Sequence, residues 1–404
     1  MTSTGSATRV RETSAPSVSP WLVLAVAFYV SVVAVMAQFA APPLMPVLMD
    51  AFRIDITQAS SLMSVFAVTG LILALPAGLV LGRFGPLVTG LVASATVVAG
   101  SVLAAAAPDF GVLLAGRAVQ GIGMGLIGVT APAVVAAAFS PDRRGTPMGI
   151  WAMWVPVGSL LMYLIGPSLA VAMGWSAVWW LTAILAAIGL FAWVAVLGAA
   201  GLRGVPGGGS ARRALADLRD GLAGRDIWLL VVVFALFATA NGAANTFIAV
   251  FLTKERGFDV TGAAAISSLA MVGMAVGSLA AGVIGDRIGS RRRVYTVALL
   301  LSAPLLMLPY VTTGPLLAVG LLLFGTVTGA IPSAVFAAVP DALPHPRLGG
   351  AGMAGIMLGQ NGGFVVGPIL FAALLPFLGW QASAAASGVL LVAAAGVGWR
   401  ARVR

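Results

Sequence analysis

The sequence predicts an all-α integral membrane protein of 12 transmembrane helices, arranged as two parallel-repeat bundles of six. The first observation behind this prediction is composition. Of 404 residues, 60% are hydrophobic and 8% are charged, and the mean hydropathy is +1.06. The apolar residues lie in runs of about 20 or more, which cross a hydrocarbon core about 30 Å thick at about 1.5 Å per residue.

The second observation is an internal repeat. Residues 78–85 read GLVLGRFG and residues 282–289 read GVIGDRIG, an offset of 204 residues. Both copies run in the same direction, so we expect a symmetry axis along the membrane normal. Further matching dipeptides are Gly-Pro at 166–167 and 367–368, and Gly-Trp at 174–175 and 379–380.

Each apolar run is expected to be helical, because lipid-exposed backbone must satisfy its own hydrogen bonds. The abundant glycine, 51 residues, indicates close backbone packing between these helices. The expected spans are 21–49, 58–81, 87–107, 110–138, 146–173, 177–199, 227–253, 261–285, 294–312, 315–338, 349–377 and 380–399.

The polar segments divide the chain. Residues 1–20 are rich in Ser, Thr and Pro and are expected to form a disordered cytoplasmic N-terminus. Within the segment between the bundles, residues 211–222 are amphipathic, which fits either a surface helix or a flexible connection. The bundles are expected at 21–199 and 227–400, with a cytoplasmic linker at 200–226 and a cytoplasmic tail at 401–404.

The basic residues predict the topology. Of 22 Lys and Arg, 18 fall on one side of the expected membrane and three on the other, with Arg117 inside a span. This asymmetry follows the positive-inside rule, so both termini are expected in the cytoplasm. The net charge of +10 is therefore attributed to a membrane-facing surface and not to nucleic-acid binding.

The sequence offers little for catalysis. It has no cysteine, and its one histidine, His345, lies in an expected loop. It contains no nucleotide-binding phosphate loop, and no Asp or Glu falls in the middle of a span. We therefore expect neither an enzyme nor a cofactor or metal site.

Three motifs give the chain a likeness to a known family. Residues 282–293 read GVIGDRIGSRRR, residues 113–125 read LLAGRAVQGIGMG, and residues 363–368 read GFVVGP. In these motifs, and from about residue 20 to its end, the chain resembles the major facilitator superfamily of secondary transporters. The motifs match that family's loop between helices 8 and 9, its helix 4 pattern and part of a packing motif. The resemblance implies two bundles that rock around a central site and expose it to each side in turn.

In this family the loop is thought to latch the two halves together. The resemblance therefore implies a latch at Asp286, Arg287 and Arg291. Gly82 stands where the first half would carry the acid, so one latch is expected instead of two. The packing motif that marks antiporters is incomplete in helix 5, where Met162 replaces a glycine, and this weakens an antiport assignment.

Arg117 is the one ionisable residue expected well within a span. Burying it costs about 2.5–3.5 kcal/mol on insertion scales, so it needs a partner or a wet cavity. It either lines the solute path or is a structural arginine bonded to backbone carbonyls. Asp50, at the outer end of helix 1, is the nearest candidate for a proton site.

Uncharged polar residues are further path candidates, since the resemblance implies a path lined by helices 1, 4, 7 and 10. Asn241 and Asn245 share one helical face. The alternative role for each polar candidate is a hydrogen bond between helices. For Trp154 in helix 5, the alternative role is packing against a neighbouring helix. The path candidates are Gln38, Arg117, Gln120, Asn241, Asn245, Gln360, Asn361 and Trp154.

The predicted function is transport of a small organic solute or anion, driven by a solute or ion gradient. The alternatives are a proton-linked drug efflux antiporter and, from another class, a sensor or receptor that does not transport. The expected partners are the solute and the lipid bilayer, without nucleic acid, and the protein is expected to be a monomer. A composition rich in arginine, alanine and glycine favours a bacterial plasma membrane.

Overall fold

The structure is a computed structural model that describes residues 18–74, 76–140, 143, 145–201, 211–345 and 348–403. Across these ranges the chain is helical and contains no strand, which confirms the expected fold class. Most of the expected N-terminal segment, residues 1–17, lies outside the described residues.

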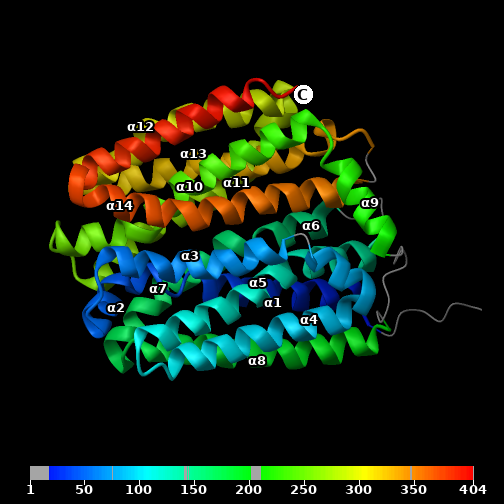
Figure 1. The fold of residues 1–404 in the computed structure, drawn as a ribbon, viewed down its shortest axis with the longest axis horizontal. Coiled ribbons are helices and arrows are strands. Elements are labelled where there is room, and N and C mark those ends of the chain that lie inside the picture. The colour runs from blue at the N-terminus through cyan, green and yellow to red at the C-terminus, as the bar shows by residue number, and fades with distance from the viewer. Residues whose placement is uncertain are drawn as a thin grey trace, which may run out of the picture.

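Two helical bundles lie side by side, one from each half of the chain (Figure 1). The amphipathic part of the linker forms α9 (Ala211–Gly221). The first bundle contains α1 (Pro20–Gln38), η1 (Pro42–Leu44), α2 (Met45–Phe52), α3 (Ile56–Leu73), α4 (Pro76–Ala105), α5 (Phe110–Ala138), α6 (Gly145–Ala152), α7 (Trp154–Met173) and α8 (Ser176–Ala199). The second contains α10 (Arg225–Lys254), α11 (Val260–Ile288), α12 (Arg291–Val311), α13 (Pro315–Ala338), η3 (Pro340–Ala342) and α14 (Gly349–Gly398).

The two bundles are packed in the same way. In the first, α3 and α4 both pack against α5, and α4 packs against α8. In the second, α11 and α12 both pack against α13, and α12 packs against α14. The contacts between bundles are also paired, with α3 against α14 and α7 against α11. This correspondence agrees with the twofold repeat that the sequence predicts.

Single glycines form three of the tight turns between spans. Gly85 (φ 75°, ψ 169°) turns the chain inside α4, and Gly379 (φ 71°, ψ 179°) does so inside α14. Gly174 (φ 87°, ψ 159°), the repeat partner of Gly379, has the same backbone conformation. This region of φ and ψ is essentially restricted to glycine. The 50 residues of α14 are thereby divided into two spans, so the 11 long apolar helices provide the expected 12 spans.

Three expected spans are interrupted, which corrects their predicted continuity. Proline explains each break, because it has no N–H for the carbonyl four residues earlier and the helical hydrogen bonding fails there. The prolines are Pro42, Pro76 and Pro156. The breaks divide the expected span 21–49 between α1 and η1, the span 58–81 between α3 and α4, and the span 146–173 at Met153.

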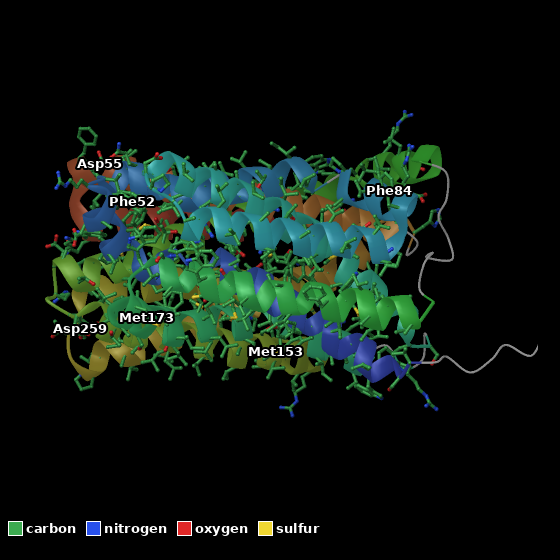
Figure 2. The ribbon with its side chains drawn as sticks, turned by 90° about the horizontal axis from the view of Figure 1, so that it is seen from below. Phe52, Asp55, Phe84, Met153, Met173 and Asp259 are labelled. Atoms are coloured by element: carbon green, nitrogen blue, oxygen red, sulfur yellow. The ribbon has the colours of Figure 1, made fainter. Side chains whose placement is uncertain are left out.

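The bundles are in close contact at one end, which we call the closed end; the opposite end, which carries α9, is the linker end. Figure 2 shows Phe52 and Asp259 at the closed end and Phe84 at the linker end. Every residue of α10 from Phe237 to Leu252 is buried, whereas buried and more exposed positions alternate from Trp228 to Leu236. The bundles therefore separate toward the linker end.

Candidate functional site

Arg117 on α5 is completely buried, and every N–H of its guanidinium has a partner. The guanidinium also lies over the Phe66 ring, 4.5 Å from its centroid. Arg117 therefore ties α1 and α3 to α5. Its Nε donates to the Leu62 carbonyl (3.1 Å), Nη1 to the Ala37 carbonyl (2.5 Å) and Gln120 Oε1 (2.8 Å), and Nη2 to the Gln38 carbonyl (2.8 Å) and the Met63 sulfur (3.8 Å).

The break in α1 explains why a cation is needed at this point. α1 ends at Gln38, and Pro42 has no N–H for the Gln38 carbonyl. The last carbonyls of a helix carry partial negative charge and are commonly stabilised by a cation. Arg117 occupies this position at the end of α1, so it acts as a buried helix cap.

Polar contacts extend from Arg117 through the first bundle. Gln120 accepts from Arg117 and donates from Nε2 to Ser101 Oγ (2.8 Å). Thr182 Oγ1 donates to the same Ser101 oxygen (3.2 Å). The network thus joins α5 to α4 and α8. It commits Arg117 and Gln120 to contacts within the bundle, which favours the structural alternative for these two path candidates.

The remaining amide candidates fall into two groups. Asn245 donates to the Asn241 carbonyl (2.9 Å) and Asn361 to the Met357 carbonyl (2.9 Å), each within its own helix. In contrast, the side-chain amides of Gln38, Asn241 and Gln360 have no hydrogen-bond partner in the part of the chain that the structure describes. These three amides, on α1, α10 and α14, have unused hydrogen-bonding capacity, and their role as path residues stays a prediction.

Trp154 begins α7 and stacks on Trp151, with ring centroids 5.2 Å apart and planes 20° apart. The Trp151 indole donates to Ser31 Oγ on α1 (3.1 Å), which holds the pair against that helix. Trp154 is half-buried and packs against two apolar clusters, one that contains residues of both bundles and one that lies within the first bundle. Its role as a path residue stays a prediction.

Side chains join the two bundles at the closed end. Tyr163 Oη donates to the Asn245 carbonyl (2.9 Å), and Asp50 forms an ion pair with Lys254 (3.0 Å). The Asp50 side chain is 70% exposed, which places this proton-site candidate at the rim and not at membrane depth. Ser64 Oγ on α3 also donates to the Val365 carbonyl in α14 (2.9 Å).

The sequence alone does not indicate these contacts between bundles. A hydroxyl such as that of Tyr163 or Ser64 has many possible backbone partners, and its partner here lies in the other half of the chain. Lys254 is the only lysine in the sequence, which is the one signal that could have identified it.

The expected latch residues lie at the linker end. Arg287 is exposed at the end of α11, and Arg291 Nη1 donates to the Ala337 carbonyl of α13 (3.0 Å). The side chain of Asp286 lies outside the described part of the structure. The Ala337 contact is within the second bundle, so a latch to the first bundle stays a prediction for a state in which the linker end is closed.

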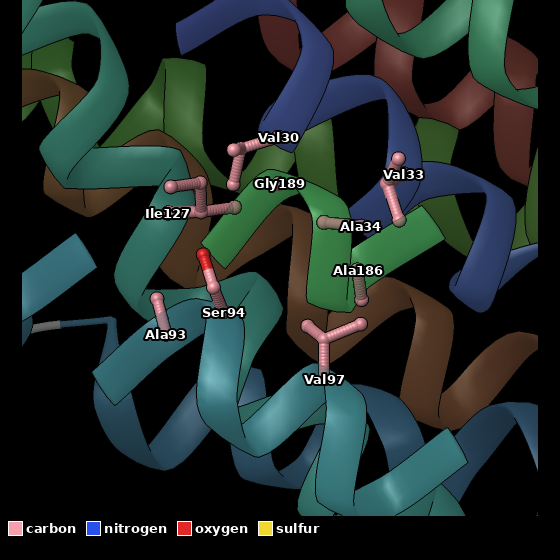
Figure 3. A pocket seen from close by; sticks show the side chains of 9 residues that line it. All are labelled: Val30, Val33, Ala34, Ala93, Ser94, Val97, Ile127, Ala186 and Gly189. Atoms are coloured by element: carbon pink, nitrogen blue, oxygen red, sulfur yellow. The ribbon is translucent and has the colours of Figure 1, made fainter. Parts of the chain in front are cut away.

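A small cavity lies inside the first bundle (Figure 3), and its lining includes neither the amide candidates nor Trp154. Val30, Ile127 and Gly189 are among its buried lining residues, and the Ser94 hydroxyl in its wall has no hydrogen-bond partner. The cavity has room for about one water molecule. It is too small to be the solute site.

We expect Tyr163→Phe to loosen the closed end. The Tyr163 hydroxyl bonds the opposite bundle, and such a hydrogen bond contributes about 1 kcal/mol, or about fivefold in a conformational equilibrium. A cysteine introduced at buried Leu48, in a chain without natural cysteines, should then react faster with a maleimide. Tyr310→Phe is the control, since the Tyr310 hydroxyl has no partner. Equal labelling rates in the two variants would contradict this role for Tyr163.

Comparison with known proteins identifies relatives. The sequence profile of the Major Facilitator Superfamily matches residues 27–269 and 237–404. The chain is 34% identical over 122 residues to the major facilitator superfamily multidrug transporter mfsC of Aspergillus fumigatus, covering 30% of this chain and 24% of that protein. It is 33% identical over 120 residues to the proton myo-inositol cotransporter of Homo sapiens, covering 29% of this chain and 18% of that protein. The matched stretches thus span about a quarter or less of these relatives.

Solved structures share the fold along nearly the whole chain. A bacterial homologue of the human lysosomal transporter Spinster, inward-facing and unoccupied, has a TM-score of 0.78 at 17% identity, covering 96% of this chain and 97% of that one. A D-xylose–proton symporter has a TM-score of 0.76 at 16% identity, covering 94% and 97%. At such identities the likeness concerns the fold alone.

Proposed function

Since this chain belongs to the Major Facilitator Superfamily, we propose that it is a secondary transporter that moves a small organic solute by alternating access. The observation that carries the proposal is the arrangement of two repeat-related bundles, in contact at one end and separated toward the other. Rocking the bundles would break the contacts of Tyr163 and Asp50 at the closed end. It would leave the buried network of Arg117 inside the first bundle intact.

We place the linker end in the cytoplasm, which makes this conformation inward-facing. The support is the basic charge gathered there, including Arg219, Arg287 and Arg400. The Spinster homologue of similar fold is also described as inward-facing. We further propose a monomer in a plasma membrane with both termini cytoplasmic, and the latch of Asp286, Arg287 and Arg291 as a feature of the opposite conformation.

We infer that transport is not coupled to protons. Proton relays in membrane proteins depend on carboxylates or histidines at membrane depth. In the described part of this chain, the acidic residues lie in loops or near helix ends, and Asp50 is paired at the exposed rim. The driving force would then be the gradient of the solute itself. The proton coupling in the names of two relatives belongs to those proteins.

A proton-linked drug efflux antiporter is the nearest alternative within transport. The name of the fungal relative favours a drug-type solute, but an antiporter of this kind would need a proton site that the described spans do not offer. A sensor of the same fold would bind its ligand without transporting it across the membrane.

Counterflow in proteoliposomes tests these proposals. Compounds that raise the melting temperature of the purified protein would be radiolabelled and followed into vesicles preloaded with the unlabelled compound. We expect transient accumulation, with an initial rate that does not change when nigericin and valinomycin with potassium collapse the pH and voltage gradients. A rate that follows the pH gradient would contradict uncoupled transport. Binding without any flux would identify a sensor.

A further inference from the structure

The two bundles touch through α3 and α14, which lie side by side where the bundles meet (Figure 1). Ser64 Oγ donates to the Val365 carbonyl (2.9 Å). Further toward the linker end, a Cβ added to Gly70 would lie only 2.8 Å from Asn361 Oδ1 and 3.3 Å from Asn361 Cγ. Gly70 is the one described glycine whose nearest neighbours at the Cβ position belong to the other bundle. α14 approaches α3 this closely because residue 70 has no side chain.

The Asn361 amide is held in place on the other side of this contact. Its Nδ2 donates to the Met357 carbonyl, one turn earlier in α14 (2.9 Å). With Nδ2 bonded there, Oδ1 faces Gly70, and Nδ2 itself lies 3.7 Å from the position of a Cβ at Gly70. The amide would have to break its hydrogen bond to swing away, so it presents a firm surface to α3.

The contact between Gly70 and Asn361 lies near mid-depth. Gly70 is midway between the start of α3 and the turn inside α4, and Asn361 is near the middle of the part of α14 that precedes its own turn. The equivalent contact in the repeat, α7 against α11, lies on the other side of the symmetry axis. When two rigid bodies rock against each other, contacts near the middle persist while contacts at the ends form and break.

Opening the closed end would bring Gly70 and Asn361 closer together. The bond from Ser64 to Val365 lies nearer the closed end than they do. As the bundles tilt apart at that end, α3 rolls along α14 toward the linker end, and the point of closest approach moves from Ser64 to Gly70. A side chain at residue 70 would collide with the amide during this motion, because packed interiors have no spare volume.

We propose that Gly70 and Asn361 form the pivot on which the two bundles rock, and that the space at residue 70 sets how readily the closed end opens. Both are positioning residues, since they contact each other across the boundary between the bundles. The inference rests on the alternating access proposed above and names the contact about which that motion turns.

Gly70→Ala tests the pivot. A cysteine at buried Leu48 reports the opening of the closed end through its reaction with a maleimide, in a chain without natural cysteines. The rate would be measured with Tyr163 intact and in the Tyr163→Phe background, where we expect faster labelling. Because the added methyl overpacks the contact, Gly70→Ala should lower the rate at least fivefold in both. An unchanged or higher rate would overturn the proposal, since a variant that is merely less stable labels faster.

Asn361→Ala tests the partner. Removing the amide makes room for the methyl, so Gly70→Ala should have no effect on labelling in the Asn361→Ala background. Equal slowing with and without the amide would show that the two residues do not act on each other. If Gly70→Ala does not fold, Asn361→Ala alone decides. It frees space beside Gly70 and should raise the labelling rate at least twofold, and an unchanged rate would overturn the pivot.

Gly320→Ala is the matched control. A Cβ at Gly320 would lie 2.9 Å from Leu308 Cβ, which is as tight as the contact at Gly70, but both residues belong to the second bundle. We expect this variant to lower the melting temperature without slowing the labelling of the cysteine at Leu48. Slowing as large as that in Gly70→Ala would assign the effect to general overpacking and not to a pivot.

Labelling and counterflow separate this inference from transport itself. Slower labelling in Gly70→Ala, cancelled by Asn361→Ala, in a protein without counterflow would contradict transport and leave the pivot standing. Counterflow in a protein whose labelling rate responds to neither substitution would contradict the pivot and leave transport standing.

Discussion

Arg117→Met should destabilise the protein more than any other side-chain substitution outside glycine positions. The variant keeps an apolar stem but removes five N–H donors. It leaves the carbonyls of Ala37, Gln38 and Leu62 without their partner in a buried site. Each unpaired buried acceptor costs about 1–3 kcal/mol, and the broken end of α1 loses its cap. We expect a large fall in melting temperature in detergent, whether or not a ligand is present.

Two variants complete this experiment. Arg117→Lys keeps the charge but not the planar fork of donors, so we expect it to recover only part of the stability. Arg219→Met removes an exposed arginine of α9 and should change the free energy of unfolding by no more than about 0.5 kcal/mol. A stable, well-folded Arg117→Met protein that fails only in ligand binding would contradict the capping role and restore Arg117 to the solute path.

Gly277→Ala should prevent the close approach of α11 and α13. A Cβ at Gly277 would collide with the backbone carbonyl of Thr326, and one at Gly329 would collide with that of Met274. The two helices meet through Gly-xxx-Gly patterns, 273–277 on α11 and 325–329 on α13. Backbone atoms cannot rotate away as a side chain can, so the helices must move apart. We expect a loss of monodisperse protein in size-exclusion chromatography, or a melting temperature far below that of the wild type.

The same helix offers a matched control. Gly282, five residues further along α11, has no atom within 4 Å of the position of a Cβ. Gly282→Ala should therefore be tolerated, and it gains about 0.5–1 kcal/mol of helix preference. Equal behaviour of the two variants would show that α11 and α13 are not held together through their backbones.

The first span and Arg117 show which features the sequence predicts and which it does not. The span expected at 21–49 crosses the membrane as predicted, but the structure breaks it between α1 and η1, before Pro42. Composition also identified Arg117 as a residue that needs partners. It could not identify those partners, because they are carbonyls of Ala37, Gln38 and Leu62, and every residue type has a carbonyl.

The polar path candidates show the same limit. Gln38, Gln120, Asn241 and Asn361 are alike in sequence as amides in apolar runs. The structure separates them, since Gln120 and Asn361 are bonded to neighbours while Gln38 and Asn241 are not. Which amide is free depends on the atoms that surround it, and the sequence of one helix does not contain that information.

Hydrophobicity and chain symmetry were sufficient for the overall architecture. Runs long enough to cross a bilayer, the duplicated motifs and the one-sided distribution of arginine together determine 12 helices in two equivalent bundles, because water, lipid and backbone hydrogen bonding act on each segment separately. Only the tertiary structure decided which end is closed, that Arg117 caps α1, and that Trp151 is bonded to Ser31 of that helix. These features depend on contacts of a few ångströms between segments far apart in the chain, and such distances are set by packing and not by the order of residues.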